Sequence, residues 1–314
     1  MSRERIAGAP VSWGVIEIPD WGYQMPADRV LKEASSLGLS AIEAGPEGLL
    51  PADPAEVSDL LSGYDLKLVG GFVPAVISEP GAREQELARV EERAEFFAAA
   101  EADVVVLAAM PASEDVGKFV EIDGDAWRTL FESLRSVEEI CARHGVEVSL
   151  HPHYGTVIER DDQLKRFLEG SEMSLCLDTG HLVIGGSDPV EIAALAGDRV
   201  NHVHLKDVDT GVVEKLASRE LSFREAAEED AFRPLGDGDV DIGGVVDQLK
   251  GSSYGGVVRV GAGLRGRGGA AGRRGAHGRS GQEPEVPASA SRGFAVNTQF
   301  PRTESGPVPL KSGG

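Results

Sequence analysis

Three stretches of the chain decide the predicted fold: residues 146–153 (VEVSLHPH), 174–181 (SLCLDTGH) and 200–207 (VNHVHLKD). Each starts as a short apolar run and ends on polar side chains that can carry chemistry. Apolar runs of this length are typical of buried parallel strands, which are covered by helices on both faces. We therefore predict three strands whose carboxyl ends hold functional groups.

Similar runs recur through the first 260 residues, and helical patterns separate them. The predicted strands lie near residues 6–13, 40–44, 66–72, 103–108, 146–151, 174–178, 200–205 and 255–260. Apolar residues at helical spacing predict helices at residues 28–37, 54–62, 84–100, 127–144, 161–168, 189–196 and 240–249. Eight strands alternating with helices predict a (β/α)8 TIM barrel of the α/β class. An open doubly wound sheet is the alternative, which the missing GxGxxG motif after the first strand disfavours.

Composition excludes several classes of protein. The chain has 314 residues, of which 41% are hydrophobic, so it can bury a large core. Its longest apolar stretch, residues 104–110, is too short to cross a membrane. The first residues lack the layout of a secretion signal, and there are only two cysteines, so we expect a cytoplasmic protein. The net charge of −21 argues against nucleic acid or an anionic membrane as a partner.

The composition changes near residue 260. Residues 261–314 contain eight basic and three acidic residues and 13 of the 40 glycines, which leaves 23 basic and 49 acidic residues before them. We therefore divide the chain into a barrel, residues 1–260, and a disordered tail, residues 261–314.

The change falls inside the last predicted strand, so the barrel would lack its closing helix. Residues 260–264 can be encoded as GTC GGA GCA GGA CTC, which reads Ser-Glu-Gln-Asp when shifted by one base. We therefore predict that the tail is an out-of-frame translation, with a natural basic tail as the alternative.

Histidines gather at the ends of three successive predicted strands. A carboxylate, Asp178, lies among them, and the barrel topology brings these strand ends to one rim. Imidazoles with a carboxylate suit a divalent ion such as Mn, Co, Fe or Zn. The histidines concerned are His151, His153, His181, His202 and His204. Each motif also has a structural interpretation: a solvated turn for HPH, a barrel-wall residue for one histidine of HVH, and an Asx turn for LDTGH.

Four segments together resemble the xylose-isomerase-like TIM barrels and, more narrowly, their inosose dehydratase branch. They are HPHYGTVIE (151–159), LCLDTGHLVIGGSDP (175–189), DRVNHVHLKDV (198–208) and FRPLGDGDVD (232–241). GAPVSWGVIE (8–17) and VGGFVP (69–74) also fit, and the resemblance covers roughly residues 5–260.

The resemblance implies a divalent ion held by ligands from strands five to eight. It assigns Asp178 and His204 as ligands, with His151 at the strand-five position where many members have Glu. Mn or Co is the expected ion, with Zn, Fe or Mg as alternatives. His181 matches a position that contacts the substrate near the metal. The strand-eight Glu of the family has no counterpart in GGVVRVGAG (255–263).

A cyclic keto-polyol such as 2-keto-myo-inositol suits this chemistry. A metal on the ketone acts as a Lewis acid, a general base removes the neighbouring proton, and loss of the next hydroxyl gives a 1,2-dione. The proton-transfer candidates are His181, Glu43 and Lys206, because histidine titrates near neutrality and the other two follow strand ends. Pairing with Asp207 is the structural alternative for Lys206, and a hydroxyl contact or a cap is the alternative for Glu43.

The substrate-binding candidates are Trp13, His153 and Glu47. Trp13 would form an apolar wall against the ring, with a place in the core as the alternative. The GDG segment at residues 236–238 either shapes a loop over the site or makes a plain turn.

Rival functions share the scaffold. A sugar or hydroxypyruvate-type isomerase or epimerase would use the same enolate, and a relative without metal would be non-catalytic. An endonuclease would need a basic face, which residues 1–260 with a net charge of −26 do not offer. We expect a small polyol or keto-sugar as the partner and leave a homo-oligomer open.

Overall fold

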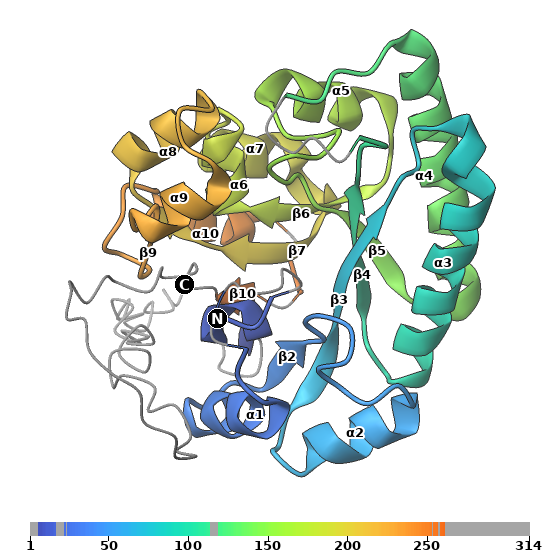
Figure 1. The fold of residues 1–314 in the computed structure, drawn as a ribbon, viewed down its shortest axis with the longest axis vertical. Coiled ribbons are helices and arrows are strands. Elements are labelled where there is room, and N and C mark those ends of the chain that lie inside the picture. Colours follow the sequence, from blue (N-terminus) through green and yellow to red (C-terminus); the bar gives the residue numbers. More distant parts are fainter. Residues whose placement is uncertain are drawn as a thin grey trace, which may run out of the picture.

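The computed structural model describes residues 6–16, 22, 24–113, 119–252, 254–256 and 258–260. Its parallel strands close into a barrel in the order β1-β10-β7-β6-β5-β4-β3-β2 (Figure 1). The strands are β1 (Ile6–Gly8), β2 (Ala41–Glu43), β3 (Lys67–Ala75), β4 (Val104–Ala109), β5 (Glu147–Leu150), β6 (Ser174–Asp178), β7 (Val200–Leu205) and β10 (Val258–Val260). Because β10 pairs with both β7 and β1, the predicted barrel is confirmed and the open sheet is excluded.

Helices between the strands form the outer layer of the barrel (Figure 1). They are α1 (Ala27–Ser36), α2 (Pro54–Ser62), α3 (Pro80–Ala99), α4 (Gly124–His144), α5 (Asp161–Gly170), α7 (Pro189–Ala196) and α10 (Ile242–Gly251). Each of the seven predicted helices is confirmed, with bounds that differ by a few residues.

The helix ends follow from local sequence. Asp53, Asp123 and Asp188 accept backbone N–H groups at the starts of α2, α4 and α7, as aspartate does at an N-cap. Gly145 ends α4 with a φ of 72°, a left-handed conformation that glycine adopts without strain. These signals were readable in the sequence, which explains why the helix bounds agree well.

Small side chains fill the inside of the barrel below the site. They form a separate buried cluster of Ala7, Ala41, Val69, Val104, Val106 and Cys176. Residues two apart on a strand face the same side, so Glu43 and Asp178 continue this inward row from Ala41 and Cys176. The barrel interior therefore changes from apolar to charged at the carboxyl ends of its strands.

A long excursion between β7 and α10 was missing from the predicted elements. It contains β8 (Asp207–Val208), α8 (Thr210–Ala217), α9 (Phe223–Glu228) and β9 (Phe232–Arg233), and β8 pairs with β9 in an antiparallel manner. The helix α6 (Thr179–Ile184), also unpredicted, contributes Ile184 to the buried cluster of this excursion. Figure 1 shows α8, α9 and β9 grouped at one side of the barrel, beside β6 and β7.

Two predictions concern residues that the structure does not describe. The tail at residues 261–314 and its out-of-frame origin lie outside the described part of the chain, which reaches Val260.

Among the described helices, none has both the length and the apolar character that crossing a membrane requires.

Candidate active site

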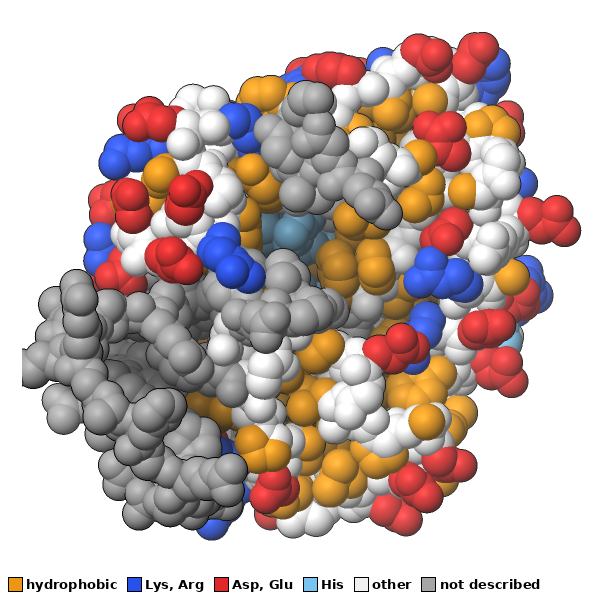
Figure 2. Space-filling view, viewed as in Figure 1, with side chains coloured by type: hydrophobic (Ala, Val, Ile, Leu, Met, Phe, Trp, Pro, Cys, Tyr) orange, Lys and Arg blue, Asp and Glu red, His pale blue; other side chains and the backbone are white. Residues whose placement is uncertain are grey.

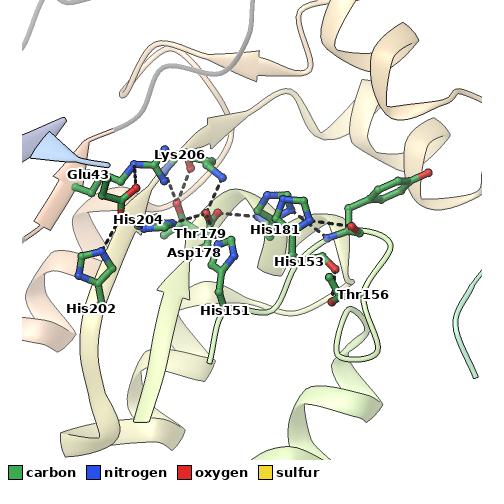
Figure 3. Close-up of polar contacts among 12 residues, drawn as sticks. Glu43, His151, His153, Thr156, Asp178, Thr179, His181, His202, His204 and Lys206 are labelled. Atoms are coloured by element: carbon green, nitrogen blue, oxygen red, sulfur yellow. Dashed lines mark hydrogen bonds and ion pairs between the residues drawn. The ribbon is translucent and has the colours of Figure 1, made fainter. Parts of the chain in front are cut away.

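Asp178 is the centre of the predicted metal site. It is the last residue of β6 and the N-cap of α6, where its Oδ1 accepts the His181 backbone N–H at 3.0 Å. Its Oδ2 lies 3.1 Å from His151 Nε2 and 3.2 Å from His204 Nδ1 (Figure 3). The structure thus brings the three predicted ligands together, all of them buried.

These donors fit a divalent ion. Two ligand atoms bound tetrahedrally to one ion, each about 2.0–2.2 Å away, are separated by roughly 3.4 Å. The 3.1 Å and 3.2 Å distances at Asp178 are close to that value. The group around Asp178 whose ligand atoms all lie within 4.8 Å of one another consists of His151, Asp178 and His181, and thus contains His181 instead of the predicted His204.

A lysine forms an ion pair with the same carboxylate. Lys206 Nζ lies 2.7 Å from Asp178 Oδ2. Burial would raise the pKa of Asp178, but the Lys206 ammonium and the neighbouring imidazoles hold that pKa well below its usual value. Asp178 is therefore ionised, as a metal ligand must be.

His151 is held in its neutral form. Burial lowers its pKa well below the usual value, and the contact with Asp178 compensates only in part. Its Nδ1 has no hydrogen-bond partner within the part of the chain that the structure describes. A neutral imidazole has a lone pair for a metal, so the protonation state of His151 suits ligation.

A second buried carboxylate, Glu43, lies behind His204. Its Oε1 lies 2.9 Å from His202 Nε2 and 2.8 Å from His204 Nε2, and its Oε2 is 3.2 Å from Arg259 Nε. Burial would raise the pKa of Glu43, but Arg259 and His204 hold that pKa well below its usual value. Both nitrogens of His204 thus face carboxylates, and Nδ1 is the one directed to Asp178.

His153 and His181 form a third group, arranged around the backbone of one residue, Tyr154. His153 Nδ1 donates to the Tyr154 carbonyl oxygen at 2.8 Å, and the Tyr154 N–H donates to His181 Nδ1 at 3.4 Å. The two ring centroids are 3.8 Å apart. Burial lowers the pKa of His153 to about 4 and the pKa of His181 well below its usual value, so both rings are neutral at pH 7.

A cavity of about 910 Å³ opens above these residues. Its polar lining consists of Glu47, Arg89, Arg93, His153, Tyr154, His181 and Lys206. Its apolar lining includes Pro46, Phe72, Phe96, Met110, Phe223 and Phe232. Figure 2 shows pale-blue histidine at the bottom of a hollow surrounded by apolar side chains. The volume is ample for a small ring-shaped substrate.

The family model of the xylose isomerase-like TIM barrels matches residues 31–272. The chain belongs to this family. An inosose dehydratase of Geobacillus kaustophilus is 31% identical over 267 residues, which cover 82% of this chain and 86% of that protein. An inosose dehydratase of Clostridium perfringens is 28% identical, with 82% of this chain and 90% of the relative covered. The predicted family and its inosose dehydratase branch, a group of hydro-lyases, are confirmed.

Other relatives widen the picture. The rhizopine catabolism protein MocC of Rhizobium meliloti is 28% identical, over 80% of this chain and 78% of its own. Among solved structures, the zinc-bound IolI protein superposes with a TM-score of 0.64 at 16% identity, covering 83% of this chain and 89% of its own. A D-psicose 3-epimerase from Clostridium cellulolyticum with D-tagatose gives 0.63 at 16%, with 83% and 86% covered. At this identity the structures show a shared fold alone.

Two predicted site residues, the substrate-binding candidate Trp13 and the proton-transfer candidate Glu43, do not line the cavity. Trp13 is 4% exposed, belongs to the main hydrophobic core and donates from Nε1 to Glu33 Oε2 at 2.9 Å. A Cβ on Gly8 would lie 3.3 Å from the Trp13 ring, so the ring packs tightly on the β1 backbone. The structure therefore favours the core interpretation of Trp13. Glu43 is likewise absent from the cavity lining, which favours support of His204 over contact with substrate.

Lys206 and its neighbour Asp207 have separate partners. Lys206 pairs with Asp178, whereas the Asp207 carboxylate accepts the backbone N–H groups of Gly236, Gly238 and Val240 at 2.8–3.0 Å. A Cβ on Gly238 would lie 2.3 Å from Asp207 Oδ1, so that position requires glycine. The alternative in which Lys206 pairs with Asp207 is therefore wrong, and the GDG segment is a loop built around a buried carboxylate.

Arg259 is the functional residue that the sequence analysis missed. It lies on β10 in register with His204 and is 5% exposed. The available signal was an arginine within a predicted buried strand, because a buried guanidinium requires a carboxylate partner. Likewise, residues 202 and 204 face the same side, so both histidines of HVH point to Glu43 rather than one into the wall.

Proposed function

We propose that this protein is a metal-dependent hydro-lyase that removes water from 2-keto-myo-inositol (inosose) and yields a 1,2-dione. The observation that carries the proposal is the convergence of His151, His204 and Lys206 on one oxygen of Asp178, beside a cavity whose polar end holds two neutral histidines. The relatives named inosose dehydratase support the substrate class.

Three residues would hold the ion: His151 through Nε2, Asp178 through Oδ2 and His204 through Nδ1. When bound, a divalent metal would supply Lewis acidity that makes the proton beside the ketone easier to remove. Mn or Co is our choice of ion, and Zn is the ion in the IolI structure. Glu43 would fix His204 by accepting from its Nε2, as carboxylates behind ligating histidines commonly do.

His153 is placed to take the proton. Its Nδ1 carries hydrogen, because it donates to a carbonyl, so Nε2 of the neutral ring has the free lone pair. Attack by Nε2 breaks the C–H bond next to the ketone, and the electron pair forms the enolate. This assignment gives His153 a catalytic role beyond the substrate contact that the sequence predicted.

His181 is placed to donate a hydrogen bond. Its Nδ1 accepts from a backbone N–H, so the neutral ring carries hydrogen on Nε2 and can stabilise an oxygen in the cavity. The His153 imidazolium then gives its proton to the departing hydroxyl, the C–O bond breaks, and water leaves. The enol that forms relaxes to the dione, and one proton has moved from carbon to water. Lys206 is placed to donate to a substrate oxygen.

A shift of the reading frame in the gene would explain why the strand-eight Glu of the family is missing. We propose that residues 261–314 are read out of frame, since a one-base shift can restore Glu after Val260. Resequencing near codon 260 tests this, and a confirmed frame in which no one-base change restores a Glu and a helix would refute it.

Incubation with keto-inositol tests the function. We expect a dione chromophore that requires a divalent ion and disappears in chelator. An isomerase or epimerase would return the proton from His153 to carbon, so it would give isomers and solvent-hydrogen exchange without a chromophore. Exchange without a chromophore would therefore replace the proposal by that alternative.

A further inference from the structure

The two backbone groups of Tyr154 give its two histidine neighbours opposite tautomers. Its carbonyl accepts from His153, and its N–H donates to His181. The N–H belongs to the peptide unit that joins His153 to Tyr154, and the carbonyl to the unit that joins Tyr154 to Gly155, so both hydrogen bonds depend on the backbone position of Tyr154. The roles proposed for the two rings therefore depend on what holds Tyr154 in place.

A buried carboxylate holds the next residue of the same loop. Glu159 is 3% exposed, and its Oε2 accepts the Gly155 N–H at 2.9 Å. The loop closes on itself as well, because Thr156 Oγ1 donates to the carbonyls of His153 and Ile158 at 2.7 Å and 3.0 Å. The segment from His153 to Glu159 is thus a compact turn with Glu159 at its base.

Arg219 reaches this turn from the excursion. It lies between α8 and α9 with a φ of 63°, and its Nη2 lies 2.8 Å and 2.9 Å from the two oxygens of Glu159. Its guanidinium stacks 4.1 Å from the Tyr154 ring centre and 4.3 Å from that of Phe119. It therefore fixes both the base of the turn and the side chain of Tyr154.

The ion pair between Arg219 and Glu159 is not expected to add much to the free energy of unfolding. Its Nε and Nη1 are buried and have no hydrogen-bond acceptor among the described residues. A buried ion pair with unsatisfied donors adds little to stability, because desolvation offsets the attraction. What the pair provides is a fixed position for the segment that carries His153.

We infer that Glu159 and Arg219 are positioning residues, which clamp the backbone on both sides of Tyr154 so that His153 presents an Nε2 lone pair and His181 an Nε2–H. The catalytic consequence rests on the proposed function, but the tautomers themselves do not. Neither residue lines the cavity, so each acts through Tyr154 and Gly155.

Nitrogen NMR tests the clamp directly. The full chain is labelled with ¹⁵N-histidine and supplied with Zn²⁺, a diamagnetic ion, and two-bond ¹⁵N–¹H spectra report which nitrogen of each ring is protonated. We expect Nδ1–H for His153 and Nε2–H for His181. In Arg219→Met and in Glu159→Gln we expect mixed tautomers for at least one of the two rings.

Kinetics supply the second readout. We expect kcat to fall about 10- to 100-fold in both variants, with KM changed less than threefold, as for lost outer-shell partners. Arg219→Lys keeps the charge and should recover part of kcat. Arg233→Met is the matched control, because it removes the Arg233–Asp209 ion pair of the same excursion without touching the turn.

The outcomes separate the two proposals. Unchanged tautomers and kcat in folded Arg219→Met would overturn the clamp, and so would the same tautomer on both rings of the unmodified chain. Tautomers that shift in the variants of a chain without dehydratase activity would support the clamp and refute the proposed function. If Arg219→Met fails to fold, the NMR spectra of Arg219→Lys and Glu159→Gln decide.

Discussion

Two buried carboxylates in this barrel have the same kinds of partner. Asp178 contacts His151, His204 and the Lys206 ammonium. Glu43 contacts His202, His204 and the Arg259 guanidinium. We call them the Asp178 cluster and the Glu43 cluster, and His204 belongs to both.

They differ in access and in the kind of cation. Lys206 is the one member of the Asp178 cluster that lines the cavity, whereas no member of the Glu43 cluster does. An ammonium on a flexible stem can leave its carboxylate for a ligand, whereas a guanidinium makes a more rigid pair. Residue types alone thus do not distinguish a reacting group from its support; the cavity and the cation do.

The largest effect should follow from breaking the Asp178 cluster. We expect Asp178→Ala to lose metal binding and at least about 10³-fold in kcat/KM, because the ion loses its only charged ligand among the three. Calorimetric titration with Mn²⁺ and turnover of keto-inositol measure both. Full activity in this variant would contradict the assignment of the cluster.

Breaking the Glu43 cluster should affect stability more than chemistry. In Glu43→Gln the Arg259 charge stays buried without a counter-charge, which costs about 3–5 kcal/mol of the free energy of unfolding. We expect activity to fall only about 10- to 100-fold, because His204 loses its support but keeps its place. Urea unfolding measures the first effect, and Glu43→Gln combined with Arg259→Met should recover part of the loss. An unchanged free energy of unfolding in Glu43→Gln would contradict the buried pairing of Glu43 with Arg259.

Lowering the pH should reduce the free energy of unfolding, because the buried histidines near Asp178 are neutral in the folded chain. Burial lowers the pKa of His153 to about 4, whereas an unfolded histidine titrates near 6.5. Below about pH 6.5 the unfolded chain therefore binds a proton that the folded chain does not. The free energy of unfolding should be level above that pH and fall towards pH 4, by about 3 kcal/mol for this residue. Urea unfolding at pH 7.5, 6.0 and 5.0 measures the slope.

A variant pair isolates this contribution. His153→Asn should reduce the slope between pH 6.5 and 5 without abolishing it, because His151 and His181 also have lowered pKa values, while His144→Asn, at the end of α4, should keep the full slope. The charged and titratable groups that act on His153 in the unmodified chain are Lys206, Asp178 and His204. The two clustered carboxylates have lowered pKa values, so their stabilisation is complete above about pH 4 and is lost only at lower pH. An equal slope in both variants would contradict the burial of His153.

The smallest effect should come from a residue outside both clusters. Trp13→Phe keeps an aromatic ring in the core but loses the hydrogen bond to Glu33. We expect a loss of about 1–2 kcal/mol in the free energy of unfolding and unchanged kcat and KM. Thermal unfolding and turnover check this, and a KM raised tenfold would restore the predicted substrate wall.

The sequence predicted the features that depend on topology. Asp178, His151 and His204 end successive strands, and a closed barrel brings such ends together whatever the side chains are. Contacts across the barrel were beyond reach, because no periodicity links Glu43 to Arg259. The two-residue strands β8 and β9 are too short to produce a pattern, so the excursion and its Arg219 were missed. Trp13 was misplaced because the predicted strand at residues 6–13 is too long: β1 ends at Gly8, and Trp13 is the last residue of a 3-10 helix, Pro10–Trp13.

The three residues of β10 have a consequence for synthesis. Arg259, the counter-charge of Glu43, comes from the strand that also closes the barrel between β7 and β1. While the ribosome still holds this segment, Glu43 and the two histidines beside it lack their cation, and the wall between β7 and β1 is open. Completion of the barrel and electrical balance at its centre thus happen in a single event, and a chain cut short before Val258 would fail at both.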